Sequence, residues 1–261
     1  MHSNDGGENL LAGGDIRLAR AKCLVKLGRW VSQEKENGVG DDVVFEALTE
    51  ATVLAPSWVK AWHNLAMFHF RQVDQREAAG GGLEDLMAHV VPAVQAFHRS
   101  LSLSRTASHQ QDAMRFLTLW FKYGSVPELS SAMEGALGSL PIDTWLDVVP
   151  QIIARINLPD TIVRGQIHDL LFRIGREHPQ VLIYPLTVAG ESPDPVRKEA
   201  GRSLLHRMST GCEPAASPPF AKMSEPSPTN ISTCQSSTRP FTGADYALSL
   251  AQSFPSLCSR A

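Results

Sequence analysis

The sequence predicts an all-α fold, an α-solenoid of stacked antiparallel helical hairpins followed by a disordered C-terminal tail. Three observations carry this prediction. Apolar residues recur every three or four positions from about residue 16 to residue 208, which is the period of an amphipathic helix. No sustained stretch alternates apolar and polar residues as a β-strand does. After about residue 209 the chain is rich in Ser, Thr and Pro, and such a segment buries too little apolar surface to offset the entropy lost on ordering.

The predicted helical domain spans residues 15–208. It lies between a polar, glycine-rich N-terminus (1–14) and the tail (209–261), and both of these are predicted to be disordered. A first helix is expected at about 16–36, ending before Asn37-Gly38. A second helix is expected at 41–54, because Asp41-Asp42 suits a helix N-terminus. The first helix should bury one apolar stripe, made of Ile16, Ala19, Cys23, Leu27 and Trp30.

The next hairpin begins after the turn at 55–58, where Ser57 is expected to cap a helix that runs from about 57 to 76. Small residues around this turn let two helices approach closely, and a tryptophan fills the groove between hairpins, as in tetratricopeptide-like repeats. The residues of this signature are Ala51, Ala55, Pro56, Ala61, Trp62, Leu65 and Ala66. The glycines at 80–82 lack the Lys-Ser or Lys-Thr of a phosphate-binding loop, so we expect a flexible loop there.

Further helices are predicted at about 84–104, 109–123 and 127–138. The apolar stripe from Ile142 to Ile156 predicts one helix, kinked at Pro150 because proline lacks a backbone donor. Another stripe runs from Val163 to Ile174. His178-Pro179 should start the helix after it, since proline suits a first helical turn. Successive amphipathic helices joined by tight turns are typical of HEAT-like repeats.

Composition excludes several classes of protein. The net charge of −3 gives no basic footprint for nucleic acid. No run of about 18 apolar residues predicts a membrane span, and the N-terminus has no secretory signal, so we expect a cytoplasmic protein. The cysteines form no CxxC pair, so we expect unpaired thiols and no metal site, with Cys23 as a small core residue. The cysteines are Cys23, Cys212, Cys234 and Cys258.

The sequence contains no motif for catalysis. A kinase needs a catalytic Asp and a metal-binding Asp, but neither a His-Arg-Asp-like loop nor Asp-Phe-Gly occurs. There is no HExxH and no GxSxG either. His63, His98 and His168 each stand on a predicted helix without another ligand at the third or fourth position. We therefore assign no catalytic residue, no metal ligand and no cofactor.

Four segments occur in a fixed order, namely Phe97–Ser104, Leu117–Gly124, Ile142–Leu146 and Leu182–Ala189. With their surroundings, from about Ile16 to Met208, they resemble the FAT region of TOR-type serine/threonine kinases, in the phosphatidylinositol-kinase-related family. The family's chains continue with a rapamycin-binding domain and a kinase domain, and this sequence contains neither. The resemblance thus implies a fragment, from a truncated, alternatively spliced or mispredicted gene product.

The resemblance implies a non-catalytic helical scaffold within a TOR-type kinase that acts in nutrient and growth signalling. The implied partners are the kinase domain and subunits of the TOR complex, in the cytoplasm or at endomembranes reached through those partners. Uncovered repeat faces also imply self-association. The alternative is an independent helical-repeat adaptor that binds a partner protein in a groove between hairpins.

Lys60 is the single candidate for ligand binding. It lies in Ser57-Trp58-Val59-Lys60-Ala61-Trp62. In FAT regions of the TOR type the matching lysine belongs to a basic pocket that holds an inositol polyphosphate, and the resemblance implies that role here. An ammonium group is a compact charge suited to phosphate. The alternative is a solvated lysine on a helix face, which is where single charged residues ordinarily lie.

Overall fold

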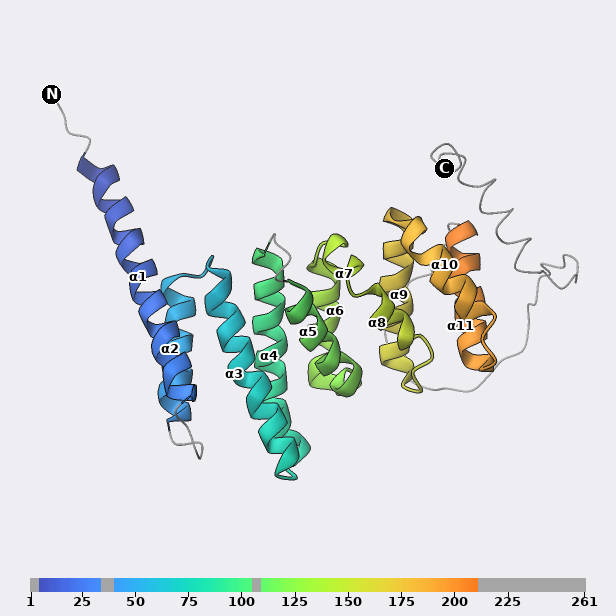
Figure 1. The fold of residues 1–261 in the computed structure, drawn as a ribbon, viewed down its shortest axis with the longest axis horizontal. Helices are drawn as coiled ribbons and strands as arrows, with labels where there is room; N and C mark the ends of the chain where they lie inside the picture. The colour runs from blue at the N-terminus through green and yellow to red at the C-terminus, as the bar shows by residue number, and fades with distance from the viewer. Residues whose placement is uncertain (1–4, 34–39, 105–108, 211–261) are drawn as a thin grey trace, which may run out of the picture. The chain divides into compact units, whose positions relative to one another are not determined.

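A computed structural model describes residues 5–33, 40–104 and 109–210, and these residues form eleven α-helices and no strand (Figure 1). The prediction of an all-α fold is therefore confirmed. The predicted disorder of residues 1–4 and 211–261 lies outside the described residues.

The described helices pack into two compact units, one that reaches as far as Leu170 and one that begins at Leu171. The sequence pattern treats 15–208 as one domain. In a repeat array each helix packs mainly on its neighbours, so the same periodicity continues across such a division without marking it.

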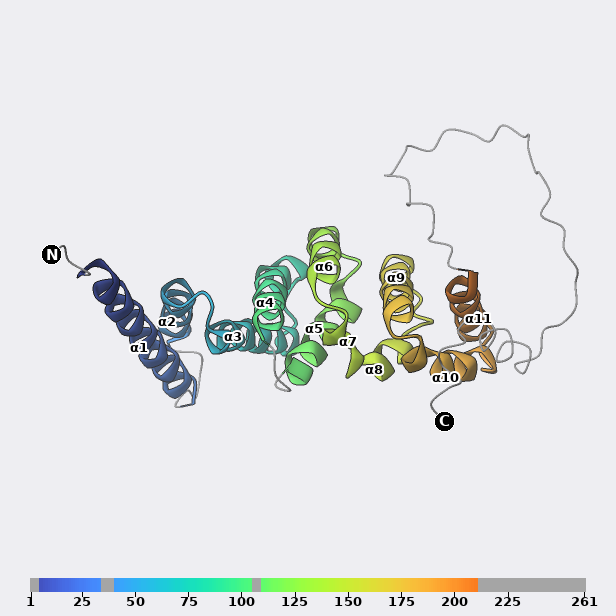
Figure 2. The same ribbon diagram turned by 90° about the horizontal axis from the view of Figure 1, so that it is seen from above.

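The first unit consists of antiparallel helices that follow one another in chain order (Figures 1 and 2). The main packed pairs are α1 with α2, α3 with α4, α2 with α3, and α4 with α5 and α6. The helices are α1 (Asp5–Gln33), α2 (Asp41–Leu54), α3 (Val59–Ala78), α4 (Leu83–Leu103), α5 (His109–Tyr123), α6 (Pro127–Ser139), α7 (Asp143–Leu146), α8 (Val149–Ala154) and the first part of α9 (Thr161–Glu177).

Helix α1 differs from its prediction in two respects. It begins at Asp5, within the segment expected to be disordered. Leucine and alanine in residues 10–12 favour helix, and a helix extends readily from a turn that is already formed. The predicted buried stripe is also wrong, because Ile16 is 69% exposed and Trp30 is 63% exposed. Cys23, expected in the core, is exposed as well.

The face that α1 buries carries smaller residues. Ala21, Val25 and Gly28 are buried against α2. A Cβ atom added at Gly28 would lie 3.3 Å from the side chain of Leu48, so the two helices are close there. The close approach lets Leu48 and its neighbours fill the interface at the density of a protein interior. Two apolar stripes competed for burial, and the one with smaller side chains packs on α2.

The connection from α3 to α4 is an ordered turn and not the flexible loop that its glycines predict. The N–H of Gly81 donates to the carbonyl of Arg76 at 2.8 Å, and the N–H of Gly80 donates to Glu77 at 3.0 Å. Gly80 has a φ of +75°, in the left-handed region that glycine adopts without steric cost. This is a Schellman motif, which satisfies the last carbonyls of α3 and returns the chain tightly into α4.

Two other local predictions fail for identifiable reasons. Ser57 does not cap α3: Trp58 occupies the N-cap position, and no side chain bonds to the free backbone N–H groups there. Instead, Trp62 Nε1 donates to the carbonyl of Pro56 at 2.8 Å and secures the turn. The predicted kinked helix from 142 to 156 is two short helices, α7 and α8. Pro150 stands in the first turn of α8, where its missing N–H is not needed.

Buried aromatic rings form the centre of the first unit. Trp120, Trp145, Phe97 and Phe116 are all fully buried, and the rings of Phe116 and Trp145 lie 5.8 Å apart. Trp120 Nε1 donates to Gln166 Oε1 at 2.8 Å, which ties α5 to α9. Aromatic side chains bury the most apolar area per residue, so they dominate the stability of this unit.

The second unit contains the end of α9, α10 (Pro179–Gly190) and α11 (Pro195–Thr210), with α10 packed on α11. The predicted start at His178-Pro179 is confirmed, because Pro179 stands in the first turn of α10. Small residues allow close packing: a Cβ atom on Gly201 would lie 2.7 Å from the backbone nitrogen of Gly190.

Candidate functional site

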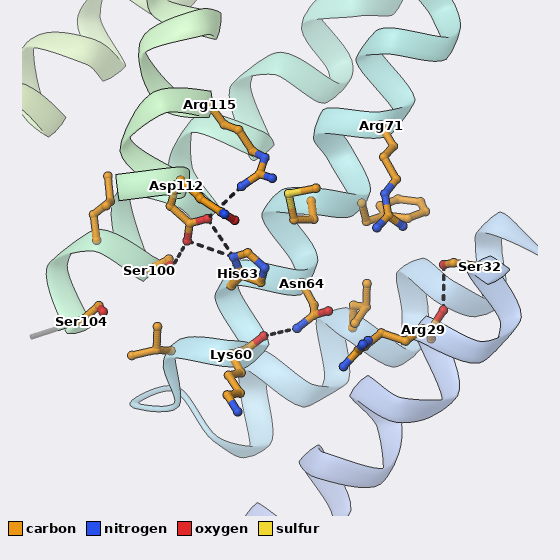
Figure 3. A pocket seen from close by; sticks show the side chains of 17 residues that line it. Arg29, Ser32, Lys60, His63, Asn64, Arg71, Ser100, Ser104, Asp112 and Arg115 are labelled. Carbon is orange, nitrogen blue, oxygen red and sulfur yellow. Dashed lines mark hydrogen bonds and ion pairs between the residues drawn. The ribbon is translucent and has the colours of Figure 1, made fainter. Parts of the chain in front are cut away.

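A cavity of about 400 Å³ opens in the first unit between α1, α3, α4 and α5 (Figure 3). Its lining is mostly polar and comes from several helices. The polar lining residues are Arg29, Ser32, Lys60, His63, Asn64, Arg71, Ser100, Ser104, Gln111, Asp112 and Arg115. We call it the basic pocket.

Helix α3 forms one wall of the basic pocket. Lys60, Asn64, Met67 and Arg71 follow one another at steps of four, three and four residues, so they share one face of the helix. Asn64 Nδ2 donates to the carbonyl of Lys60 at 2.6 Å, within the first turns of the helix. The side chains of Lys60 and Arg71 are exposed, and their charged ends remain available to a ligand.

Two more cations come from other helices. Arg29 lies on α1 and Arg115 on α5, and Figure 3 shows them on the walls of the pocket beside α3. The lining thus holds four permanent positive charges, whereas the whole chain has a net charge of −3. Cations held around a concave surface reinforce one another's potential, so the pocket attracts anions against the charge of the chain.

Asp112 is the carboxylate of the basic pocket, and it is 3% exposed. Its oxygens lie 2.8 and 3.0 Å from Nδ1 of His63, and Ser100 Oγ donates to Oδ2 at 2.8 Å. Arg115 Nη1 lies 3.7 Å from Oδ1. A buried charge is tolerated when it is paired and hydrogen-bonded, and this carboxylate meets both conditions. The network joins α3, α4 and α5 at the floor of the pocket (Figure 3).

This arrangement suits binding better than catalysis. Guanidinium groups and an ammonium group recognise phosphate or carboxylate oxygens through charge-assisted hydrogen bonds. Ser100 donates to Asp112 and not to His63, so the serine–histidine pair of nucleophilic catalysis is not formed here. Within the described residues, no group of three or more His, Cys, Asp or Glu side chains could hold a metal ion.

The predicted binding residue, Lys60, lies in the basic pocket, and the structure brings three arginines to it that the sequence did not single out. Arg71 could have been found, because it lies eleven residues after Lys60, three turns along the same helical face. Arg29 and Arg115 carry no such signal, since only packing brings α1 and α5 to α3.

The three histidines without a ligand at helical spacing have partners outside their own helices. His63 contacts Asp112, His98 Nε2 lies 2.8 Å from Ser139 Oγ, and His168 Nε2 lies 3.0 Å from the carbonyl of Ile156. Spacing along one helix could not have revealed these contacts.

Two histidines form a hydrogen-bonded pair between α3 and α4. Nδ1 of His69 lies 3.0 Å from Nδ1 of His89, and Arg76 is near both rings. Burial, then the neighbouring His89, lowers the pKa of His69 from 6.5 to about 4. Burial also lowers the pKa of His89. Both rings are therefore neutral at physiological pH, and one Nδ1 donates to the other.

Comparison with known proteins points to one group of kinases. Residues 15–118 match the FAT domain family, and residues 128–224 match the HEAT repeats of ATR-like serine/threonine-protein kinases. The chain is 38% identical to the serine/threonine-protein kinase tor1 of Schizosaccharomyces pombe and 38% identical to the kinase mTor of Drosophila melanogaster. It is 33% identical to the kinase TOR2 of Saccharomyces cerevisiae.

These matches cover most of this chain and little of the relatives. They include 72% of the chain for the first relative and 74% for the other two. The chain spans only 8–9% of the length of each relative. In the described part of the chain, no helix is both long and apolar enough to cross a membrane.

Proposed function

We propose that this chain, whose helical part is homologous to the FAT-region segment of TOR-type serine/threonine kinases, acts as a non-catalytic helical scaffold. The observation that carries the proposal is that the residues matching the FAT domain family are nearly the same as the residues of helices α1 to α5. The FAT match at 15–118 covers most of the packed helices α1 to α5, which also build the basic pocket.

We do not assign the kinase activity of the relatives to this chain. The relatives are named as serine/threonine kinases, and the chain corresponds to a short segment of them without kinase motifs. We propose that it contributes geometry and partner contacts and transfers no phosphate itself. The proposed partners are a TOR-type kinase domain and the subunits of its complex, and the proposed compartment is the cytoplasm, or endomembranes reached through those subunits.

The outer face of α1 is the proposed contact surface for such a partner. Ile16, Leu27 and Trp30 are large, apolar and exposed there. Exposed apolar patches commonly mark protein–protein contacts, and the same face would support self-association of the isolated chain.

Binding to a purified kinase region of a TOR-type relative tests the scaffold. We expect the chain to bind in biolayer interferometry and the double variant Ile16→Glu, Trp30→Glu to bind at least about tenfold more weakly, since two charges would be buried. Ile162→Glu changes another exposed apolar residue and should bind as the unmodified chain does. If the chain does not bind the kinase region, the adaptor alternative is favoured. If the double variant binds as tightly as the unmodified chain, the contact surface is not on α1.

A second proposal concerns the basic pocket, and its four cations favour it: the pocket binds an inositol polyphosphate, with Lys60 as one contact. Several phosphate groups on a small ring need several cations around one cavity of this size, and Lys60, Arg29, Arg71 and Arg115 meet that need. A solvated lysine would need none of these neighbours.

Isothermal titration calorimetry with inositol hexakisphosphate tests the pocket. We expect Lys60→Ala and Arg71→Ala each to weaken binding about tenfold or more, because each removes a charge-assisted contact. Affinity should also fall as salt is added. Lys198→Ala removes the same kind of charge in the second unit and should leave the affinity unchanged. Binding that is equal in Lys60→Ala and in the unmodified chain would refute the proposed role of Lys60.

A further inference from the structure

We infer that residues 243–254 of the C-terminal tail pack as an amphipathic helix on an apolar hollow of the second unit. The end of α10, the start of α11 and the turn between them form this hollow. The contact depends on neither function proposed above, because those functions use α1 and the basic pocket of the first unit.

The hollow has a volume of about 500 Å³ and a mostly apolar lining. Tyr184 and Val188 stand one turn apart on α10 and line it, although they are 78% and 54% exposed. Its acidic lining residue, Glu191, is paired with Arg202 at 3.2 Å. An exposed apolar surface of this kind is stabilised when another apolar surface covers it.

The segment carries the sequence signals of one amphipathic helix. Thr242, followed by Asp245 at the third position after it, forms a capping box, and Pro255 ends the pattern. Large apolar residues recur at every fourth position and share one face, namely Tyr246, Leu250 and Phe254. Polar residues fall on the opposite face, namely Asp245, Ser249 and Gln252. The sequence therefore predicts a helix with one face that needs a partner surface.

Such a helix is not stable without that surface. Isolated helices shorter than about 12–15 residues are marginal in water, and most helical stability in proteins comes from the packing of an apolar face. The composition of residues 209–261 predicts disorder for the same reason. Docking supplies the surface that the segment lacks and the cover that the hollow lacks.

The covalent tether favours this segment over any other occupant. The tail leaves the described chain at Thr210, the end of α11, and Arg197 at the hollow lies thirteen residues earlier on the same helix. At 1.5 Å per residue, these two points are about 20 Å apart. A flexible chain as long as the connection 211–242 has a root-mean-square end-to-end distance of about 30 Å.

The reach of the connection thus matches the span that it must cross. A tether of matching length gives a local concentration on the order of millimolar. A second copy of the chain, or a separate peptide with a similar apolar face, competes at a disadvantage when its concentration is micromolar.

The three tyrosines of the chain allow a direct test. Tyr123 is buried, Tyr184 lies in the hollow and Tyr246 lies on the segment. The full chain is labelled with 3-fluorotyrosine, and each fluorine signal is assigned by changing one tyrosine to phenylalanine. A soluble gadolinium chelate then broadens the signals of the rings that solvent reaches.

The first comparison changes the segment. We expect the double variant Leu250→Glu, Phe254→Glu to broaden the Tyr184 signal several-fold more than the unmodified chain does, because carboxylates resist burial on an apolar surface. The control variant Ser249→Glu, Gln252→Glu adds the same two charges to the opposite face. It should leave the Tyr184 signal as it is in the unmodified chain.

The reciprocal comparison changes the hollow. Val188→Glu should broaden the Tyr246 signal several-fold, whereas Val53→Glu, at an exposed valine of the first unit, should not. If the chelate reaches Tyr184 equally in the unmodified chain and in the double variant of the segment, the inference is wrong. It is also wrong if protection of Tyr184 increases with protein concentration, since the occupant is then a second copy. Protection that is independent of concentration, and that only the two apolar-face changes remove, supports it.

Discussion

The variant Gly201→Ala is expected to lose helical structure in the second unit. Its free energy of unfolding should fall by at least about 1–3 kcal/mol. The added Cβ atom would lie 2.7 Å from the backbone nitrogen of Gly190 and 2.9 Å from the carbonyl oxygen of Leu186. Both are backbone atoms of α10, so neither can move aside as a flexible side chain would. Urea unfolding followed by far-ultraviolet circular dichroism measures the change.

Gly165→Ala is the matched control. Gly165 lies inside α9, and a Cβ atom there would meet nothing within 4 Å. The same substitution should therefore stabilise the chain by about 0.5–1 kcal/mol, because alanine loses less backbone entropy than glycine in a helix. If both variants unfold at the same urea concentration, α10 and α11 are not as closely packed as described.

Acid should weaken the first unit through His69 and His89. The folded-state pKa of His69, about 4, lies below its unfolded value of 6.5. The folded state therefore resists protonation, and stability present above pH 6.5 is lost as the pH falls from about 6.5 towards 4. His69 is 5% exposed, and a shift of this size corresponds to about 3 kcal/mol.

Urea unfolding at about pH 7 and at about pH 4.5 measures this loss. His69→Leu removes the buried titrating ring and should flatten the dependence on pH, although it lowers stability at neutral pH. His206→Gln removes an exposed histidine and should keep the original profile. A pH profile that is the same in His69→Leu and in the unmodified chain would contradict the assignment to this pair.

The sequence predicted the elements whose ends carry strong local signals. The two aspartates at the start of α2 and Pro179 at the start of α10 mark those boundaries, and the structure begins both helices there. Prediction from the sequence was wrong where tertiary packing decides which of two possible faces of a helix is buried. On α1 the stripe with the larger apolar residues is the predicted core, but Gly28 allows the other face to lie closer to α2. Analysis of hydrophobic periodicity takes into account the hydrophobicity of each residue. It does not take into account how closely the backbones of two helices can approach each other.

The site was predictable only in part, for a related reason. Lys60 came from resemblance, and Arg71 shares its helical face. Arg29 and Arg115 lie far away in sequence, and so does Asp112, which is hydrogen-bonded to His63 across 49 positions. Tertiary packing assembles that cluster, so no spacing rule along one helix could describe it.

The placement of the indole rings has a practical consequence for following this molecule in solution. All five tryptophans precede residue 171, so they belong to the first unit, and Trp120 and Trp145 are fully buried within it. Intrinsic fluorescence therefore reports on one unit, whereas circular dichroism reports on the helices of both. Melting curves that coincide by the two probes would show one cooperative transition, and curves that separate would show that each unit unfolds independently.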